Sequence, residues 1–447
     1  MKRKVKVIIV AAVMILTMMP SAAFAASQSP CTQSPCAHEA AIGEVHYDKF
    51  SEAVAAAQDG NTITLLKNVT MDKTYFGAEA GQSRILDLNG FTLTRTWQDW
   101  VGDDTTTKSV IYNKGALTIR DSSAAKTGKI QGYSDTSGSS GWNQEFKGAA
   151  ISNAVGATIN LEGATITRGD KESYGFYTVY NKGTINMSGG LIVNGSNSSS
   201  LVCNVEGGSD FTMTGGTLSQ KSFQALKNEP GSTVEISGGT IESGDRALQN
   251  YGTATVTNGT LNGNIQIPAG GMLTITKGVI NGKLFGDGSA EISGGTFSQA
   301  VPEEFCAPNF VPTQNADGSF GVIVPERYDI TVIDGTVKVN GIDAKDAIAG
   351  DNVSITANAA PKGKTFDKWV ITGADTSGMD VTKAELTFTM PASDVTATAT
   401  YKNAAADGDN SPGTGDETNM AIWIALIAIT TLAGAGTVLY KRKNTAE

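Results

Sequence analysis

Carboxylates are the side chains of this sequence with the clearest potential for catalysis, because hydrolysis of a glycosidic bond needs two of them roughly 5 to 9.5 Å apart. Glu235 and Glu291 occupy the same position of a repeated sequence pattern but lie three repeats apart, and so do Asp170 and Asp245. If the repeats stack at strand spacing, three steps span roughly 14 Å. Neither pair fits, so the sequence predicts no hydrolytic pair of carboxylates.

A polysaccharide lyase would instead combine clustered carboxylates for calcium with a basic residue that removes a proton. The best local groups are Arg168 with Asp170 and Glu172, and Asp245 with Arg246, each in a turn after a predicted strand. Charged residues in loops are usually solvated, and we expect these five to be so. Residues 168–170 also spell Arg-Gly-Asp, the integrin-binding tripeptide. The equivalent turn at 244–245 keeps Gly-Asp without the arginine, which favours turn chemistry over integrin binding.

Four side chains near the N-terminus offer the nitrogen and sulfur ligands that zinc prefers: Cys31, Cys36, His38 and His46. Their spacing differs from that of common zinc sites. In an exported chain a local disulfide or free thiols are favoured over a metal site. We therefore predict no metal and no cofactor. The other two cysteines, Cys203 and Cys306, are expected to be separate packed thiols.

Two long insertions interrupt the early repeats, at 94–108 and 133–147, and carry Trp97, Trp100 and Trp142. Loops on a repeat protein gather on particular faces and often bind ligands. Exposed indoles can stack on sugar rings, so these three tryptophans are candidate ligand-binding residues. The alternative is that they fold over the repeats as an apolar lid, because large aromatic side chains are usually buried.

An internal repeat supplies the elements that must position these residues. Seven turns contain a glycine pair or a variant of it, at spacings of 26, 26, 23, 20, 19 and 17 residues. The turns begin at Gly163, Gly189, Gly215, Gly238, Asn258, Lys277 and Gly294. The positions four before, two before and three after each start are always apolar. They are Ile159, Leu161, Ile166, Ile185, Met187, Ile192, Phe211, Met213, Leu218, Val234, Ile236, Ile241, Ala254, Val256, Leu261, Leu273, Ile275, Ile280, Ala290, Ile292 and Phe297.

Alternating apolar and polar residues on both sides of a glycine turn predict two short strands per repeat that face one interior. One repeat cannot bury its own apolar face, so the repeats must stack about 4.8 Å apart and hydrogen-bond to one another. The pattern begins near Thr62. A column of asparagines is predicted to form a structural amide ladder along a bend: Asn113, Asn153, Asn181, Asn204, Asn228 and Asn250.

A short helix should cap the first coil, because residues 48–58 place Phe50, Val54 and Ala57 on one helical face. The coils, this cap and the closing segment 302–308 resemble secreted right-handed parallel β-helix proteins of the pectate-lyase-like class. The predicted fold class is therefore all-β. It comprises a right-handed parallel β-helix (solenoid) over 47–324 with an N-terminal capping helix, a small β-sandwich-like module and a C-terminal transmembrane helix.

At Pro325 the sequence pattern changes, and the strands predicted after it lack the periodic glycine turns. This predicts a small β-sandwich-like module over 325–402. The predicted strands lie at 329–333, 353–356, 366–370 and 395–400. Residues 363–369, Gly-Lys-Thr-Phe-Asp-Lys-Trp, and 388–391, Phe-Thr-Met-Pro, resemble divergent internalin-type B-repeats of bacterial surface proteins. The resemblance implies a stalk or interaction module. Trp369 is expected in its core.

Both ends of the chain carry sequences typical of export. Residues 1–25 have the basic, apolar and small-residue parts of a cleaved signal peptide, and 26–46 form an N-terminal segment. A flexible tether at 403–410 precedes the pentapeptide Ser411-Pro412-Gly413-Thr414-Gly415, an apolar transmembrane span at 421–440 and a basic tail.

The order of these parts over 411–447 resembles the cell-wall sorting signal of Gram-positive surface proteins, usually Leu-Pro-x-Thr-Gly, with Ser411 in place of Leu. This implies that a sortase cleaves between Thr414 and Gly415 and joins Thr414 to peptidoglycan.

The formal net charge of −10 supplies no positive field for nucleic acid or anionic lipid, so those partners are excluded. We predict a secreted, cell-wall-anchored surface protein with a membrane-spanning precursor. Its non-catalytic β-helix would serve adhesion to carbohydrate or another host-surface ligand, with sortase and peptidoglycan as further partners. A wall-attached polysaccharide lyase or glycoside hydrolase is the alternative, and a purely structural surface protein is a further one.

Overall fold

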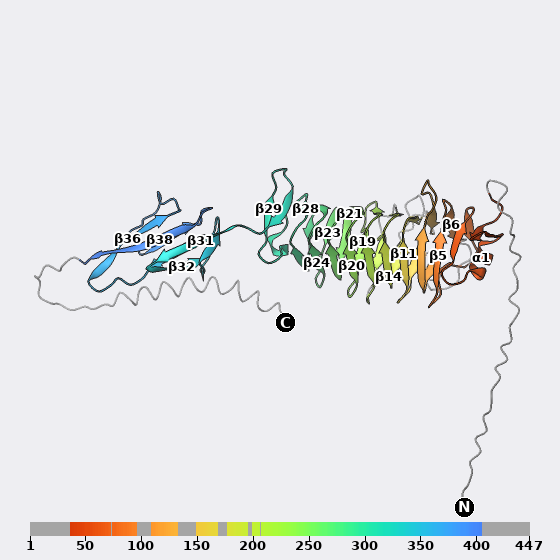
Figure 1. Cartoon of the computed structure of the whole chain (residues 1–447), viewed down its shortest axis with the longest axis horizontal. Coiled ribbons are helices and arrows are strands. Elements are labelled where there is room, and N and C mark those ends of the chain that lie inside the picture. The colour runs from red at the N-terminus through yellow and green to blue at the C-terminus, as the bar shows by residue number, and fades with distance from the viewer. Residues whose placement is uncertain are drawn as a thin grey trace, which may run out of the picture. The chain divides into compact units, whose positions relative to one another are not determined.

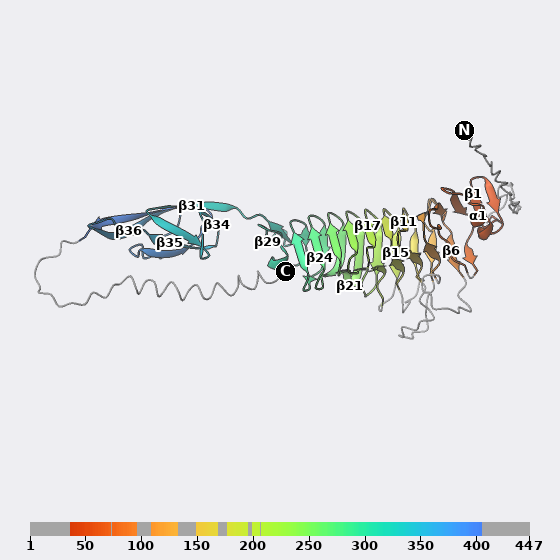
Figure 2. The same cartoon turned by 90° about the horizontal axis from the view of Figure 1, so that it is seen from below.

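The computed structural model describes residues 36–72, 74–95, 109–132, 149–168, 177–194, 199–205 and 207–404. The chain forms two compact units that divide between Pro325 and Glu326. The first unit is a stack of coils whose strands repeat along one axis, as Figure 1 and the turned view in Figure 2 show. The second unit is a small module of two sheets.

Each coil of the solenoid contributes a strand to a 12-stranded sheet, whose repeating part is here called column A. Neighbours in column A pair in parallel and in register. Its strands are β3 (Thr62–Leu65), β5 (Ser83–Asp87), β8 (Ala116–Arg120), β11 (Thr158–Leu161), β14 (Thr184–Met187), β17 (Asp210–Met213), β20 (Thr233–Ile236), β22 (Thr253–Val256), β24 (Met272–Ile275) and β27 (Ser289–Ile292). The predicted start near Thr62 is confirmed.

Column B follows the glycine turns and lies in an 18-stranded sheet. It contains β4 (Val69–Met71), β6 (Thr92–Arg95), β9 (Lys129–Gln131), β12 (Thr165–Thr167), β15 (Leu191–Asn194), β18 (Thr217–Gln220), the first parts of β21 (Thr240–Asn250) and β23 (Thr260–Gln266), β25 (Val279–Asn281) and β28 (Thr296–Phe297). These strands also pair in parallel from coil to coil.

The same sheet holds a third set of strands, column C, where two strands per repeat were predicted. Column C contains β7 (Ile111–Asn113), β10 (Ile151–Asn153), β13 (Val179–Asn181), β16 (Val202–Asn204), β19 (Leu226–Asn228), the last parts of β21 and β23, and β26 (Leu284–Phe285). The separate strands are three residues or fewer and begin with one buried apolar side chain, which is too little for a visible alternation. The prediction of two strands was therefore wrong.

The interior of the solenoid is the predicted set of apolar columns. All twenty-one predicted positions are buried, and the most exposed of them, Ala290, is 8% exposed. Register explains the columns, since Ile159 pairs with Ile185 and Ile185 with Phe211 across successive coils. Each coil thus covers the apolar face of the next, as the repeat pattern required.

The glycine pairs are required by close packing of the turns. A Cβ on Gly215 would lie 2.4 Å from the carbonyl oxygen of Ser188 in the preceding coil, a distance that a side chain cannot adopt. Gly216 has a φ of +84°, which L-residues other than glycine rarely adopt. The first glycine therefore permits stacking and the second permits the turn.

The predicted asparagine ladder is present along the bend between columns C and A. Each of the six side chains is at most 1% exposed. The Nδ2 of each of the first five donates to the Oδ1 of the asparagine in the next coil, at distances of 2.7 to 3.0 Å, and Asn250 Nδ2 donates to the Met272 carbonyl oxygen at 2.7 Å. The same nitrogen of Asn204 also donates to the carbonyl oxygen of Ser209 at 3.0 Å. Buried amides in this column are satisfied by one another and by the backbone.

Both ends of the solenoid are closed by non-repeating elements. At the start, β1 (Ala40–Ile42) and β2 (Val45–Tyr47) pair antiparallel, and helix α1 (Phe50–Ala56) buries Phe50 with Val54 and Ala57 packed on the core. The predicted capping helix is thus confirmed. At the other end, η2 (Glu303–Phe305) leads to the hairpin β29 (Val311–Gln314) and β30 (Phe320–Ile323). Such caps cover the unpaired edges of a parallel stack.

The second unit consists of two four-stranded sheets around a separate apolar core. One sheet has β31 (Arg327–Ile333), β34 (Asp346–Ile348), β36 (Lys364–Thr372) and β38 (Val395–Asn403), and the other has β32 (Gly335–Val339), β33 (Ile342–Asp343), β35 (Asn352–Ala357) and β37 (Glu385–Thr389). Trp369 lies in the core and is 2% exposed, as predicted. Among the described residues no helix has the length and apolar character to cross a membrane, and the predicted span at 421–440 lies outside them.

A buried carboxylate fixes the turns of an early coil. Asp121 is 3% exposed and accepts backbone N–H bonds from Gly90, Ser123 and Gly128 at 2.8, 3.0 and 2.6 Å. Burial by itself would raise the pKa of Asp121, but the bonds from Gly128, Ser123 and Gly90 together outweigh it and hold the pKa below its ordinary value.

The Asp121→Asn substitution should therefore lower stability at neutral pH and weaken its pH dependence. A depressed folded-state pKa contributes stability above the unfolded pKa, and this contribution is lost as pH falls through the folded pKa. Urea unfolding of both chains between about pH 7 and pH 2 measures the effect. Parallel curves for the two chains across that range would contradict the assignment.

Candidate functional site

The carboxylates considered for hydrolysis are held apart by the register of column A. Glu235 pairs with Thr255, Thr255 with Thr274, and Thr274 with Glu291. Three strand steps separate the two carboxylates, about 14 Å. Both side chains are exposed. The predicted separation of this pair is confirmed, and it exceeds the distance that either mechanism of glycoside hydrolysis uses.

The charged turn residues divide between a surface pair and a buried residue. Asp245 accepts from Arg246 Nε at 3.0 Å, and Arg246 Nη1 donates to Gln266 at 2.6 Å. This pair lies beside a register shift of β21 and is half-buried. Arg168, expected to be solvated, is fully buried directly after β12, while Asp170 lies outside the described residues.

Other predicted site residues also lie outside the part of the chain that the structure describes. They are Trp97, Trp100 and Trp142, and the sorting motif Ser411, Pro412, Gly413, Thr414 and Gly415. Their roles stay predictions.

A cluster of buried polar side chains lies at the corner between columns B and C in the middle coils. Asn194 ends β15 and pairs in register with Gln220, which ends β18. Across the corner, Thr178 precedes β13 and Ser200 precedes β16. All four are at most 3% exposed. We call these four residues the corner cluster.

The corner cluster leaves several polar atoms without hydrogen bonds. Among the described residues, neither amide atom of Asn194 has a partner, nor do Gln220 Oε1 and Thr178 Oγ1. Gln220 Nε2 does donate to the Ser199 carbonyl at 2.6 Å. Each buried unpaired group costs about 1–3 kcal/mol, so the cluster lowers stability locally. Such departures from an otherwise satisfied pattern are typical of functional sites.

The outward side of column C carries a stripe of half-buried aromatic and basic side chains, here called the tyrosine stripe. Register places Tyr112, Ser152, Tyr180 and Cys203 in one line along successive coils, with the two tyrosines half-buried and Ser152 and Cys203 buried between and beside them. The remaining members surround this line: Tyr75, Lys114, Tyr177, Lys182, Lys227, Glu229 and Tyr251.

Aromatic and cation–π contacts hold the stripe together. The rings of Tyr177 and Tyr180 are stacked with centroids 5.8 Å apart, and Lys182 Nζ lies 5.3 Å from the Tyr180 centroid. Tyr75 and Tyr112 meet edge to face at 5.2 Å, and Lys114 lies near both rings. These arrangements fix the orientation of flat rings in two places along the stripe.

The charges of the stripe nearly cancel. Lys114 pairs with Glu79 at 2.6 Å, and Lys227 pairs with Glu229 at 2.5 Å. Burial, followed by the nearby Glu229, raises the pKa of Cys203 to about 12, so its thiol stays protonated and is no nucleophile at neutral pH. Burial also raises the pKa of Tyr180. The stripe therefore suits uncharged ligands better than polyanions.

The prediction from sequence overlooked the stripe, although a short repeated triplet marks it. Tyr-Asn-Lys occurs at 112–114 and again at 180–182, around two asparagines of the ladder. Because the ladder asparagine points inward, its neighbours on both sides must point outward. The residues next to each ladder asparagine therefore define an outer face.

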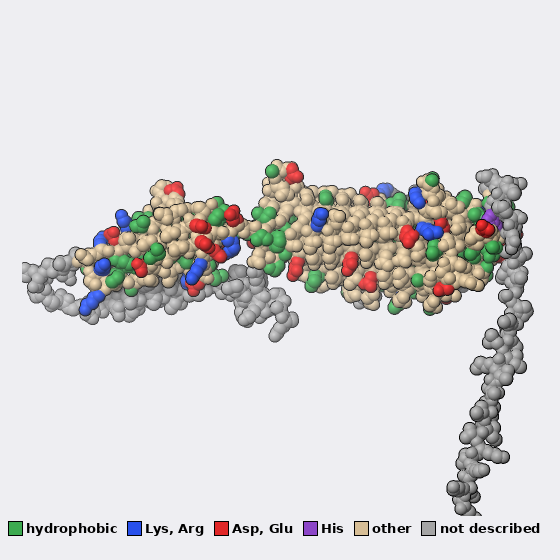
Figure 3. Space-filling model, viewed as in Figure 1, with side chains coloured by type: hydrophobic (Ala, Val, Ile, Leu, Met, Phe, Trp, Pro, Cys, Tyr) green, Lys and Arg blue, Asp and Glu red, His purple; other side chains and the backbone are tan. Residues whose placement is uncertain are grey.

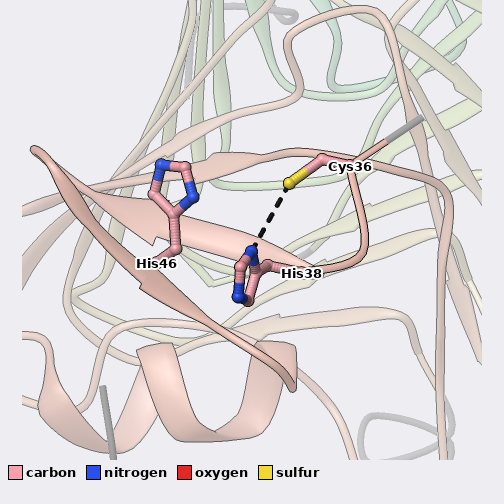
Figure 4. A group of neighbouring side chains, drawn as sticks. All are labelled: Cys36, His38 and His46. Carbon is pink, nitrogen blue, oxygen red and sulfur yellow. Dashed lines mark hydrogen bonds between the residues drawn. The ribbon is translucent and has the colours of Figure 1, made fainter. Parts of the chain in front are cut away.

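The Cys36, His38 and His46 side chains form a third group at the N-terminal hairpin (Figure 4). All three are half-buried, and their ligand atoms lie within 4.8 Å of one another. Cys36 is disulfide-bonded, in accord with the expectation of a local disulfide. The two remaining cysteines among the described residues are free thiols, with Cys203 buried and Cys306 half-buried.

Comparison with known proteins identifies only the second unit. The family model of the divergent InlB B-repeat domain matches residues 328–405, which confirms the predicted resemblance of this segment. No curated protein and no solved structure matches the chain. A B-repeat segment joined to a parallel β-solenoid indicates a protein of the surface or adhesion type.

The contrast between two buried asparagines yields a prediction. Replacing Asn194 by leucine removes two unpaired polar atoms, so stability should stay the same or rise by about 1 kcal/mol. Replacing Asn204 by leucine breaks the ladder and orphans its neighbours, which should lower stability by about 2–4 kcal/mol. Urea unfolding followed by far-UV circular dichroism compares them. Equal losses for the two variants would show that the Asn194 amide is satisfied.

Proposed function

We propose that this chain is a non-catalytic surface protein whose solenoid binds glycan chains, attached to the cell wall through its C-terminal signal. The tyrosine stripe carries the proposal. Register places Tyr112 and Tyr180 on one face two strand steps apart, about 9.6 Å, a spacing at which an extended polymer can contact both rings. Aromatic side chains are frequent anchors of binding surfaces because they supply large contact areas with little loss of freedom.

The charge of the surface favours a neutral glycan. Two of the three lysines in the stripe are paired with carboxylates, and the chain as a whole has a net charge of −10. Figure 3 shows that the solenoid face turned to the viewer carries few charged side chains. Hydroxyl and amide groups on such a face hydrogen-bond to sugars without the cost of desolvating charges.

A wall-attached polysaccharide lyase or hydrolase is the competing proposal. The fold would be shared, because we expect a right-handed helix of the pectate-lyase-like class, and strand–crossover–strand connections are almost always right-handed. What disfavours catalysis is the wide spacing of Glu235 and Glu291 and the mutual pairing of Asp245 with Arg246. A fold shared with lyases and hydrolases does not imply their activity, which depends on the residues of the site.

Glycan binding is tested by screening the purified chain against plant, microbial and mucin glycans, recording both retention and newly released sugar ends. Retention without release is expected. Tyr180→Ala should weaken it at least about tenfold, whereas Tyr180→Phe, which keeps the ring, should retain it. Trp97→Ala and Trp142→Ala test the predicted insertion residues in the same screen. Release that disappears in Asp245→Ala would establish an enzyme instead.

Wall attachment rests on the order of pentapeptide, apolar span and basic tail at 411–447. We propose that a sortase cleaves after Thr414 and transfers its carboxyl group to a peptidoglycan amine. In a Gram-positive host, Thr414→Ala should move the chain from the wall fraction to the membrane fraction. The Thr418→Ala chain, altered beyond the pentapeptide, is the matched control. Undiminished wall attachment of Thr414→Ala would exclude this route.

A further inference from the structure

Two parts of the N-terminal hairpin bring the only two histidines of the chain together. His46 lies in β2 and pairs with Ala41 of β1, so the antiparallel return places it beside the residues that precede β1. His38 and Cys36 lie in that preceding stretch. The two imidazole rings meet edge to face with centroids 5.3 Å apart, and Cys36 points at the same space (Figure 4).

The separations fit the ligand shell of a tetrahedral zinc ion. Zinc binds thiolate at about 2.3 Å and imidazole nitrogen at about 2.0–2.1 Å, so two such ligands at a tetrahedral angle lie about 3.6 Å apart. The observed distance from Cys36 Sγ to His38 Nδ1 is 3.6 Å. The His46 ligand atom lies within 4.8 Å of both. Small side-chain rotations would place all three around one ion.

A carboxylate orients one of the two imidazoles. Asp48 Oδ1 lies 3.5 Å from His38 Nε2, on the ring edge opposite the cysteine. A carboxylate there accepts the Nε2 proton and leaves the Nδ1 lone pair directed at Cys36, which is the usual support of a metal-binding histidine. The nearby Glu39 is already engaged, because it accepts from the Phe50 N–H at 2.8 Å and pairs with Lys49.

The disulfide decides whether this shell can form. Cys36 is disulfide-bonded, and a disulfide sulfur is not the thiolate that zinc requires. We propose that Cys36, His38 and His46 form a redox-gated zinc site, closed in the disulfide form and opened by reduction. A dithiol reductant transfers two electrons and two protons to the disulfide, which gives two thiols and the oxidised dithiol. Zinc then binds Cys36 as thiolate and displaces its proton to solvent, with water in the fourth position.

The proposal departs from the sequence expectation of no metal for a physical reason. Linear spacing of Cys36, His38 and His46 matches no common zinc pattern. The hairpin, however, sets the distances in space, and it adds Asp48 as a supporting carboxylate. This site is separate from the tyrosine stripe, so its test is independent of the glycan proposal.

The test is a titration of the full chain with Zn²⁺, and with Co²⁺ as a spectroscopic probe, before and after reduction by a dithiol that is then removed. The reduced chain should bind one equivalent at least tenfold more tightly than the oxidised chain and show a cobalt–thiolate absorption band. Asp48→Asn should weaken zinc binding by about 10–100-fold while keeping the band at saturating cobalt.

Matched cysteine variants assign the sulfur ligand. Cys36→Ser should abolish the band, and Cys203→Ser and Cys306→Ser should leave it unchanged, because those thiols lie elsewhere in the solenoid. His46→Gln should lower affinity with circular dichroism unchanged. Equal affinity in the two redox states, or a band that persists in Cys36→Ser, would overturn the proposal.

Discussion

Parallel, in-register hydrogen bonding between coils is the constraint on which this solenoid depends. A coil has three short strands and no second layer, so only its neighbours can cover its apolar side chains and satisfy its backbone. Register places each residue against its counterpart, and this is why aligned positions must be compatible along the whole stack. Gly215 shows the strictness of the constraint, since an added Cβ there would collide with the coil before it.

The same register builds the outer surface. Tyr112 and Tyr180 are 68 residues apart in sequence, yet they stand two strand steps apart on one face. A solenoid therefore builds a long outer face from short sequence signals that recur along the chain, and their spacing on that face is a multiple of the strand spacing. Loop length between columns can vary without disturbing this surface, because the strands alone set the period.

The sequence predicted those features that depend on periodicity. The apolar columns, the asparagine ladder and the capping helix followed from spacing, and the burial of Trp369 from the general tendency of large aromatic side chains to be buried. The third strand was missed because three residues with one buried side chain, as in Val179–Asn181, show no alternation. The Cys36, His38 and His46 group does not stand out as a metal site in the sequence. Their separation along the chain does not show that the β1–β2 hairpin brings His46 back beside His38. The corner cluster could not be predicted from the sequence, since whether a buried amide is hydrogen-bonded depends on its neighbours in space.

Two buried asparagines show the difference between polarity that the stack requires and polarity that it only tolerates. Asn204 lies within a column of amides that bond one another, with Asn181 donating to it and Asn204 donating to Asn228, so its polar atoms are satisfied at the bend. Asn194 occupies an equally buried position but finds no partner among the described residues. A repeat that selects residues for stacking alone would place an apolar side chain there, as it does at Ile192 two residues earlier. The stack therefore requires the polarity of the ladder asparagines, which bond one another along the bend, but only tolerates that of Asn194, whose burial carries the full cost of an unpaired amide.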